Sequence, residues 1–81
     1  MMQLQLIKGR FNKTEAFDLV SEMVNIKIRY HEDKIRWAEQ EEDIKMRENR
    51  IKQLQKELHE FKNQLLSNEQ AVNIESGIII A

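Results

Sequence analysis

The longest uninterrupted feature of the sequence is a stretch from Thr14 to Leu66 without glycine or proline. Residues spaced by seven form one nearly all-apolar series: Ala16, Met23, Tyr30, Trp37, Ile44, Ile51, Leu58 and Leu65. A second series, three residues later, is polar in its middle: Leu19, Ile26, Asp33, Gln40, Arg47, Leu54 and Phe61. Heptad spacing of this kind is typical of helices that pack along a coiled-coil seam. We therefore predict a helical region over about residues 13–66.

The two halves of this helical region differ in the width of their apolar surface. The first half carries four further aliphatic residues: Val20, Val24, Ile28 and Ile35. The second half keeps only the narrow two-in-seven seam. A broad face needs more than one neighbour, whereas a narrow seam needs one.

A short strand is expected on each side of the helical region. Residues 2–8 alternate between apolar and polar types, which is the period of a half-buried strand, and Gly9 is expected to end it. Asn12 and Glu15 then fit a capping box that begins a helix. Residues 72–80 form the second candidate strand, with valine and isoleucine on one face.

The strands restrict how the helical region can be arranged, because two short strands are unstable unless they pair. A single helix from Thr14 to Leu66 would be about 80 Å long and would hold them apart. A turn near residues 37–42 would give an αα-hairpin that brings them together, and an antiparallel dimer of continuous, swapped helices would do the same. Short connections between helices favour the hairpin, although residues 37–42 are good helix formers. Both forms remain open at this point.

Charge pairing also favours an antiparallel arrangement. With Leu19 set opposite Leu58 and Ile26 opposite Ile51, four flanking pairs have opposite signs: Lys34 with Glu41, Lys27 with Glu48, Arg29 with Asp43, and Glu22 with Arg50. Each pair is worth only a few tenths of a kcal/mol, so the pairs would set orientation more than stability. The predicted fold is a single helix-dominated α+β domain over residues 1–81, with an antiparallel helix pair and both terminal strands pairing at one end.

The composition of the C-terminal strand indicates that it pairs with another strand. Residues 72–80 are β-prone, carry one charge and contain no proline, so an unpaired strand would promote aggregation. Residues 2–8 are the other strand candidate in the chain. We predict that the two strands pair and that their apolar faces pack on the broad face of the first half of the helical region.

Length and composition favour association between copies. A chain of 81 residues buries only about 60% of its unfolded surface, and without cysteine it has no disulfide or thiolate metal site for support. Self-association is then the expected source of stability, in a homo-oligomer of two or more chains. Trp37, beside the possible turn, is the expected anchor. The candidate interface residues are Leu19, Met23, Ile26, Tyr30, Trp37, Ile51, Leu54, Leu58 and Phe61.

The candidate catalytic and metal-binding residues do not have the spacing that such sites require. His31 and His59 are each followed by glutamate, but the positions four residues later hold Ile35 and Asn63 instead of a second histidine. The acidic residues near position 41 are interpreted as a solvated face, because carboxylates need a dry pocket for acid–base work. Two glycines cannot build a phosphate-binding loop. We expect no enzyme activity, cofactor, metal or small-molecule substrate.

Function is therefore expected to lie in macromolecular association. The first hypothesis is a non-enzymatic structural or protein–protein interaction module that self-associates through coiled-coil-like helices. The alternative is a small nucleic-acid-associated regulator, because one basic–aromatic cluster interleaves with Tyr30 and Trp37: Lys27, Arg29, Lys34 and Arg36. A net charge of −1 argues against this alternative. The first residues lack a signal-peptide pattern and no run approaches the ~20 apolar residues of a membrane span, so a cytoplasmic location is expected.

Overall fold

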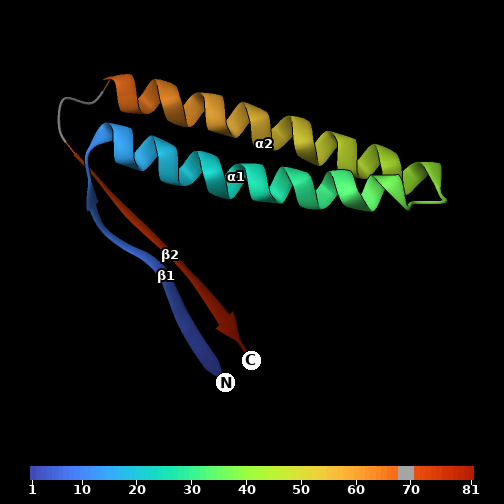
Figure 1. Ribbon diagram of the computed structural model, residues 1–81, viewed down its shortest axis with the longest axis horizontal. Helices are drawn as coiled ribbons and strands as arrows, with labels where there is room; N and C mark the ends of the chain where they lie inside the picture. Colours follow the sequence, from blue (N-terminus) through green and yellow to red (C-terminus); the bar gives the residue numbers. More distant parts are fainter. Residues whose placement is uncertain (68–70) are drawn as a thin grey trace.

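The computed structural model describes residues 1–67 and 71–81. Its elements follow the order β1 (Met2–Phe11), α1 (Lys13–Arg36), α2 (Glu41–Ser67) and β2 (Val72–Ile80). The helices lie side by side in opposite directions, and the strands form an antiparallel ribbon that extends from one end of the pair (Figure 1). The predicted α+β class is confirmed, and the chain folds as the αα-hairpin instead of as one continuous helix.

The turn between the helices falls within the predicted region. Trp37 caps α1 with φ −107° and ψ 2°, and the backbone N–H of Ala38 donates to the carbonyl oxygen of Ile35 at 3.1 Å. Charged residues flank the turn, with Lys34 and Arg36 in the last turn of α1 and Glu41, Glu42 and Asp43 in the first turn of α2. Each group of charges lies at the helix end whose dipole it complements, which stabilises the break between the helices.

The start of α1 confirms the predicted cap. Asn12 has φ −71° and ψ 169°, and its side-chain oxygen accepts a hydrogen bond from the backbone N–H of Glu15 at 2.8 Å. The N–H of Ala16 donates to the carbonyl oxygen of Asn12 at 2.9 Å. The Glu15 carboxylate accepts from the Asn12 side-chain amide, so it bonds the side chain of the cap instead of its backbone.

α2 buries the narrow seam that the heptads predict. Leu54 and Leu65 are almost fully buried, with 2% and 4% of their surface exposed. The half-buried positions that complete the seam are Ile44, Arg47, Ile51, Leu58 and Phe61. Ala16 of α1 is the third buried residue of the described chain. Since both Ala16 and Leu65 lie at the ribbon end of the helix pair, the best-packed part of the small core is there.

α1 directs a different stripe toward α2 from the one predicted. The half-buried residues that recur at heptad spacing are Phe17, Ser21, Val24, Ile28, His31 and Ile35. Two contacts show that this stripe faces α2: an Arg47 guanidinium nitrogen lies 3.0 Å from Nδ1 of His31, and Lys62 Nζ lies 5.9 Å from the centroid of the Phe17 ring. The seam of α1 therefore lies one residue after the first predicted series and two residues after the second.

The predicted layer that paired Ile26 with Ile51 is wrong, because Ile26 is 58% exposed. A physical reason is visible in the sequence of α1. The stripe through Leu19 and Ile26 reaches Asp33 near the turn, whereas the stripe through Ile28 continues to the apolar Ile35. Packing along the second stripe avoids placing a carboxylate between the helices, which would carry a desolvation cost.

The predicted interhelical charge pairs are also wrong. Among residues 1–67 and 71–81, the ion pairs are Arg36 with Asp33 at 3.8 Å and Lys45 with Glu41 at 3.6 Å, each within one helix and exposed. None of the four expected pairs forms, namely Lys34 with Glu41, Lys27 with Glu48, Arg29 with Asp43, and Glu22 with Arg50. Apolar packing and the short turn therefore set the antiparallel orientation.

The terminal strands pair with each other as predicted. Their antiparallel register runs from Met2 opposite Ile80 to Phe11 opposite Val72. Gly9 does not end the first strand, because it pairs with Ile74 and the ladder continues through Arg10 and Phe11. The register shifts between Gln5 and Ile7, which leaves one extra residue in β1 and forms a β-bulge there.

The ribbon does not pack along α1 as expected. One face of its half nearest the helices is half-buried, whereas Leu4 is 45% exposed and Ile80 is 55% exposed at the far end (Figure 1). β1 joins α1 through the single residue Asn12, and the strands leave the helix pair at an angle that separates them progressively from α1. The predicted packing of the strands on the broad helix face is therefore wrong for the outer half of the ribbon.

The rotated seam of α1 gives a matched test with two isoleucines. Ile28→Ala should lower the free energy of unfolding by about 1–3 kcal/mol, because Ile28 is half-buried toward α2. Ile26→Ala should change it by less than about 0.5 kcal/mol, since that side chain is exposed. Urea denaturation at low micromolar concentration measures both, and a larger loss for Ile26→Ala would restore the original heptad register.

Candidate interaction surfaces

The structure divides the predicted interface residues into two groups. Six of them are buried or half-buried in the chain's own packing: Leu19, Met23, Ile51, Leu54, Leu58 and Phe61. The other three remain accessible, with Ile26 58%, Tyr30 55% and Trp37 79% exposed. The buried group stabilises the monomer fold, and the exposed group is available for contact with another molecule.

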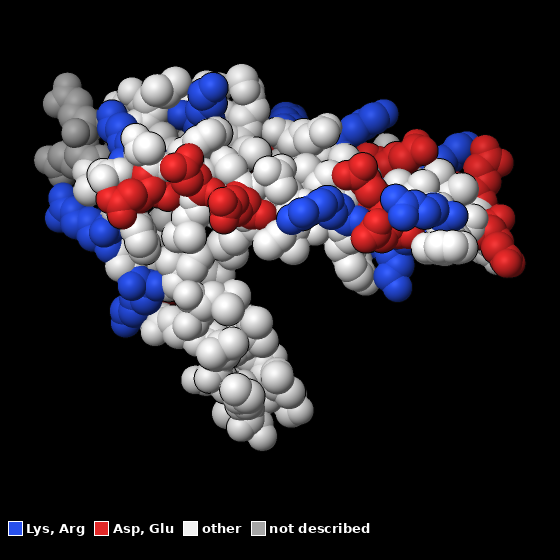
Figure 2. Space-filling model, in the orientation of Figure 1, with Lys and Arg blue, Asp and Glu red and all other residues white. Residues whose placement is uncertain are grey.

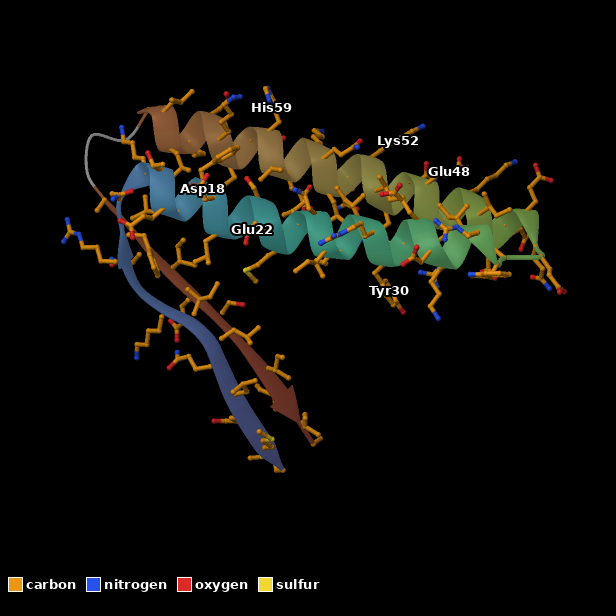
Figure 3. The ribbon with its side chains drawn as sticks, in the orientation of Figure 1. Asp18, Glu22, Tyr30, Glu48, Lys52 and His59 are labelled. Atoms are coloured by element: carbon orange, nitrogen blue, oxygen red, sulfur yellow. The ribbon has the colours of Figure 1, made fainter. Side chains whose placement is uncertain are left out.

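The exposed apolar residues of α1 form a second stripe beside the seam. Ile26 lies in a shallow hollow whose other walls include Glu22, Arg29 and Glu32. Figure 3 shows Tyr30 projecting on the side of the helix pair from which the ribbon extends. An apolar stripe bordered by charges of both signs suits contact with an amphipathic helix of another chain.

A basic–aromatic cluster forms around Tyr30 and His31. Lys34 Nζ lies 5.6 Å and the Arg47 guanidinium carbon 5.7 Å from the centroid of the Tyr30 ring, distances at which cation–π attraction acts. The rings of Tyr30 and His31 meet edge to face, with centroids 5.5 Å apart and an interplanar angle of 72°. Arg47 connects this cluster to α2 because its guanidinium also donates to Nδ1 of His31.

The predicted nucleic-acid face does not form as one surface. All four of its residues are exposed, but Arg29 and Arg36 each lie two residues beyond Lys27 and Lys34, which places them about 200° around the helix. Arg36 is further occupied by its ion pair with Asp33. Lys27 and Lys34 therefore share a face with His31, and the other two cations lie on a different side of α1.

Sequence reasoning missed the contribution of α2 to this cluster. Arg47 contacts Tyr30 and His31 directly, and Arg50 lies near enough to affect His31 electrostatically. One signal was present, because Arg47 is a charged residue at a seam position of the helix. A cation at such a position has to extend to the rim of the seam, where it meets the partner helix.

The environment of His31 disfavours its protonated form. Burial lowers the pKa of His31, and the positive charges of Arg47, Arg50 and Lys27 lower it further. The hydrogen bond from Arg47 acts in the same direction, because Nδ1 can accept only when it carries no proton. These neighbours favour the neutral imidazole of His31 over its protonated form.

Two absences hold for residues 1–67 and 71–81. No three histidine, aspartate or glutamate side chains there lie close enough to hold a metal ion. His59, the second histidine, projects outward from α2 (Figure 3). Within the same ranges, neither helix is long and apolar enough to cross a membrane.

The fold and these surfaces define a small αα-hairpin with an appended strand ribbon and with accessible apolar and basic surfaces. Comparisons with known protein families, with curated proteins and with solved structures gave no match. The function therefore has to be inferred from the surfaces themselves.

The neutral state of His31 gives a testable pH dependence. A lowered pKa means that the unfolded chain binds more protons near pH 6, so stability should fall as the pH drops below the unfolded value of about 6.5. Arg47→Gln should raise the pKa of His31 toward that value, measured by NMR titration of the imidazole. Lys52→Gln, at an exposed position on α2, is the matched control and should leave the titration unchanged. An unmoved titration in Arg47→Gln would contradict the role assigned to Arg47.

Proposed function

We propose that the protein is a non-enzymatic structural or protein–protein interaction module that associates with copies of itself. The observation that supports this proposal is the imbalance between its core and its apolar surface. Only Ala16, Leu54 and Leu65 are buried among the described residues. Large apolar side chains are exposed on every part of the fold: Met2, Leu4, Leu6, Ile26, Tyr30, Trp37, Met46, Leu66, Ile78, Ile79 and Ile80.

Such a surface costs solvation free energy as long as the chain is alone. Exposed apolar patches larger than a few hundred Å² usually mark interaction sites, and a small domain with a weak core gains stability by burying them. Association between identical chains covers these residues without a separate partner. The self-associated form is then also the more stable form.

The helices supply one route to association. α1 uses the stripe through Ile28 against α2, and its second stripe, with Ile26 and Tyr30, is free to pack on a helix of another copy. Trp37 at the turn is the most exposed of these residues, and indole rings are frequent anchors in protein interfaces. Coiled-coil-like packing between chains would extend the seam that each chain already contains.

Light scattering coupled to size exclusion tests the proposal. At 10–100 µM, concentrations at which micromolar complexes form, the particle mass should be at least twice the chain mass of 9.7 kDa. Dilution should lower both the mass and the melting temperature, because the associated chains stabilise each other by mass action. A particle of one chain with a cooperative, concentration-independent melt would contradict self-association.

We propose nucleic-acid binding as the second candidate, because α2 adds cations to the cluster around Tyr30. Lys27, Lys34 and Arg47 could contact phosphates, while the exposed Tyr30 ring offers a surface for stacking a base. The net charge of −1 and the pairing of Arg36 with Asp33 weaken the attraction.

Fluorescence anisotropy with a labelled single-stranded oligonucleotide tests this second candidate. Binding should fall at least tenfold between 50 and 200 mM salt, since cation–phosphate contacts release counterions. Tyr30→Ala should weaken it by about 1–3 kcal/mol through loss of stacking, whereas Lys52→Gln should have a small effect. Absence of binding at low salt would remove this candidate and leave the first one intact.

A further inference from the structure

The outer half of the ribbon combines exposed apolar side chains with an absence of charge. We call this part, residues 2–6 of β1 and 76–80 of β2, the distal ribbon. Its large side chains are exposed to between 42% and 71%, and none of its residues is acidic or basic. In Figure 2 it is the arm without blue or red atoms, in contrast to the helix pair. The charged ribbon residues Lys8, Arg10 and Glu75 all lie nearer the helices.

The two edges of the ribbon differ in their protection against further pairing. β1 carries the bulge between Gln5 and Ile7, and bulges twist an edge strand away from potential partners. β2 is regular from Ser76 to Ile80 and has neither a charge nor a proline there. Within residues 1–67 and 71–81, β2 has β1 as its single strand partner. The outer edge of β2 is thus an unprotected template for another strand.

We propose that β2 pairs through this edge with β2 of a second copy of the chain, antiparallel, with Ile79 opposite Ile79 of that copy. This inference rests on the proposed self-association and names the surface that produces it. The product is a four-stranded antiparallel sheet in the order β1-β2-β2-β1, with a two-fold axis between the central strands. Such a contact is closed, because both copies use the same edge.

The side-chain pattern of β2 requires a register that keeps its isoleucine face continuous across the contact, as this register does. Residues opposite each other in an antiparallel pair point to the same face of the sheet. With Ile79 on the two-fold axis, Ile78 lies opposite Ile80 of the second copy, and Met2 and Leu4 continue the same face in the neighbouring strands. A shift by one residue would invert the second copy. The isoleucine faces of the two copies would then lie on opposite sides of the sheet.

Charge identifies a second copy as the occupant. A partner strand with charged residues would have to desolvate them against an uncharged isoleucine-rich edge, which is unfavourable. β2 of another chain brings the same uncharged segment, of the same length of about 17 Å.

Disulfide crosslinking tests the proposed register, because the natural chain contains no cysteine. Ile79→Cys should form an intermolecular disulfide under mild oxidation, since opposite residues have Cβ atoms about 4.5–5.5 Å apart, close to disulfide geometry. Gln3→Cys is the matched control, because Gln3 lies opposite Ile79 in the ribbon of the same chain. Its copies would be three strand spacings apart, about 14 Å, and should not crosslink.

Light scattering of two lysine variants separates this inference from the proposed function. Ile79→Lys would place two like charges opposite each other and should raise the dissociation constant at least tenfold, whereas Gln3→Lys should leave it within about twofold. Helix content by circular dichroism should stay unchanged in both variants, since both positions are exposed.

The other possible results distinguish the proposed self-association from the β2 edge contact. A wild-type chain that stays single at 100 µM contradicts the proposed function and this inference together. A dimer that survives Ile79→Lys overturns the β2 edge contact and leaves self-association through the helices standing. A dimer that crosslinks through Gln3→Cys instead overturns the β2 edge contact and places the contact at the β1 edge. Particles larger than a dimer that depend on Ile79 would overturn the closed two-fold arrangement.

Discussion

The antiparallel packing of α1 on α2 is the contact on which the rest of the structure depends. It places the start of α1 and the end of α2 at the same end of the molecule, so the strands that precede and follow the helices can pair. A helix that continued through residues 37–40 would hold those strands about 80 Å apart. The ribbon therefore exists because the helical region reverses, and the turn is stabilised by opposite charges on its two sides.

The seam between the helices changes character along its length. At the ribbon end it contains the buried Ala16 and Leu65, and toward the turn the polar His31 and Arg47 lie among its half-buried apolar residues. Trp37 completes this trend, because it remains mostly exposed at the turn itself. Fewer apolar contacts mean a lower free energy of local opening, so the turn end should be the more dynamic end of the helix pair. The basic cluster lies in this less tightly packed part.

Sequence reasoning identified both strands, the cap at Asn12 and the seam of α2, because each has one dominant periodicity or motif. It misplaced the seam of α1 because that helix carries two apolar stripes, and only packing against α2 decides between them. The turn had a signal in the change from Lys34 and Arg36 to Glu41, although residues 37–42 have high helix propensity. The direction of the ribbon had no signal in the sequence, because it depends on the backbone angle at the single connecting residue Asn12.

The bulge in β1 connects the shape of the ribbon to its association. Alternation in a regular strand would place Met2 and Leu4 on the face opposite Ile7 and Phe11. The extra residue near Leu6 reverses this parity, so that all four share one face with Ile78. Gly77 permits the irregularity, because a Cβ there would lie 3.1 Å from the carbonyl oxygen of Leu4. The bulge thus gives the ribbon one apolar face and, by distorting β1, leaves β2 as its one regular edge, a combination that favours a closed pair of chains over an open fibre.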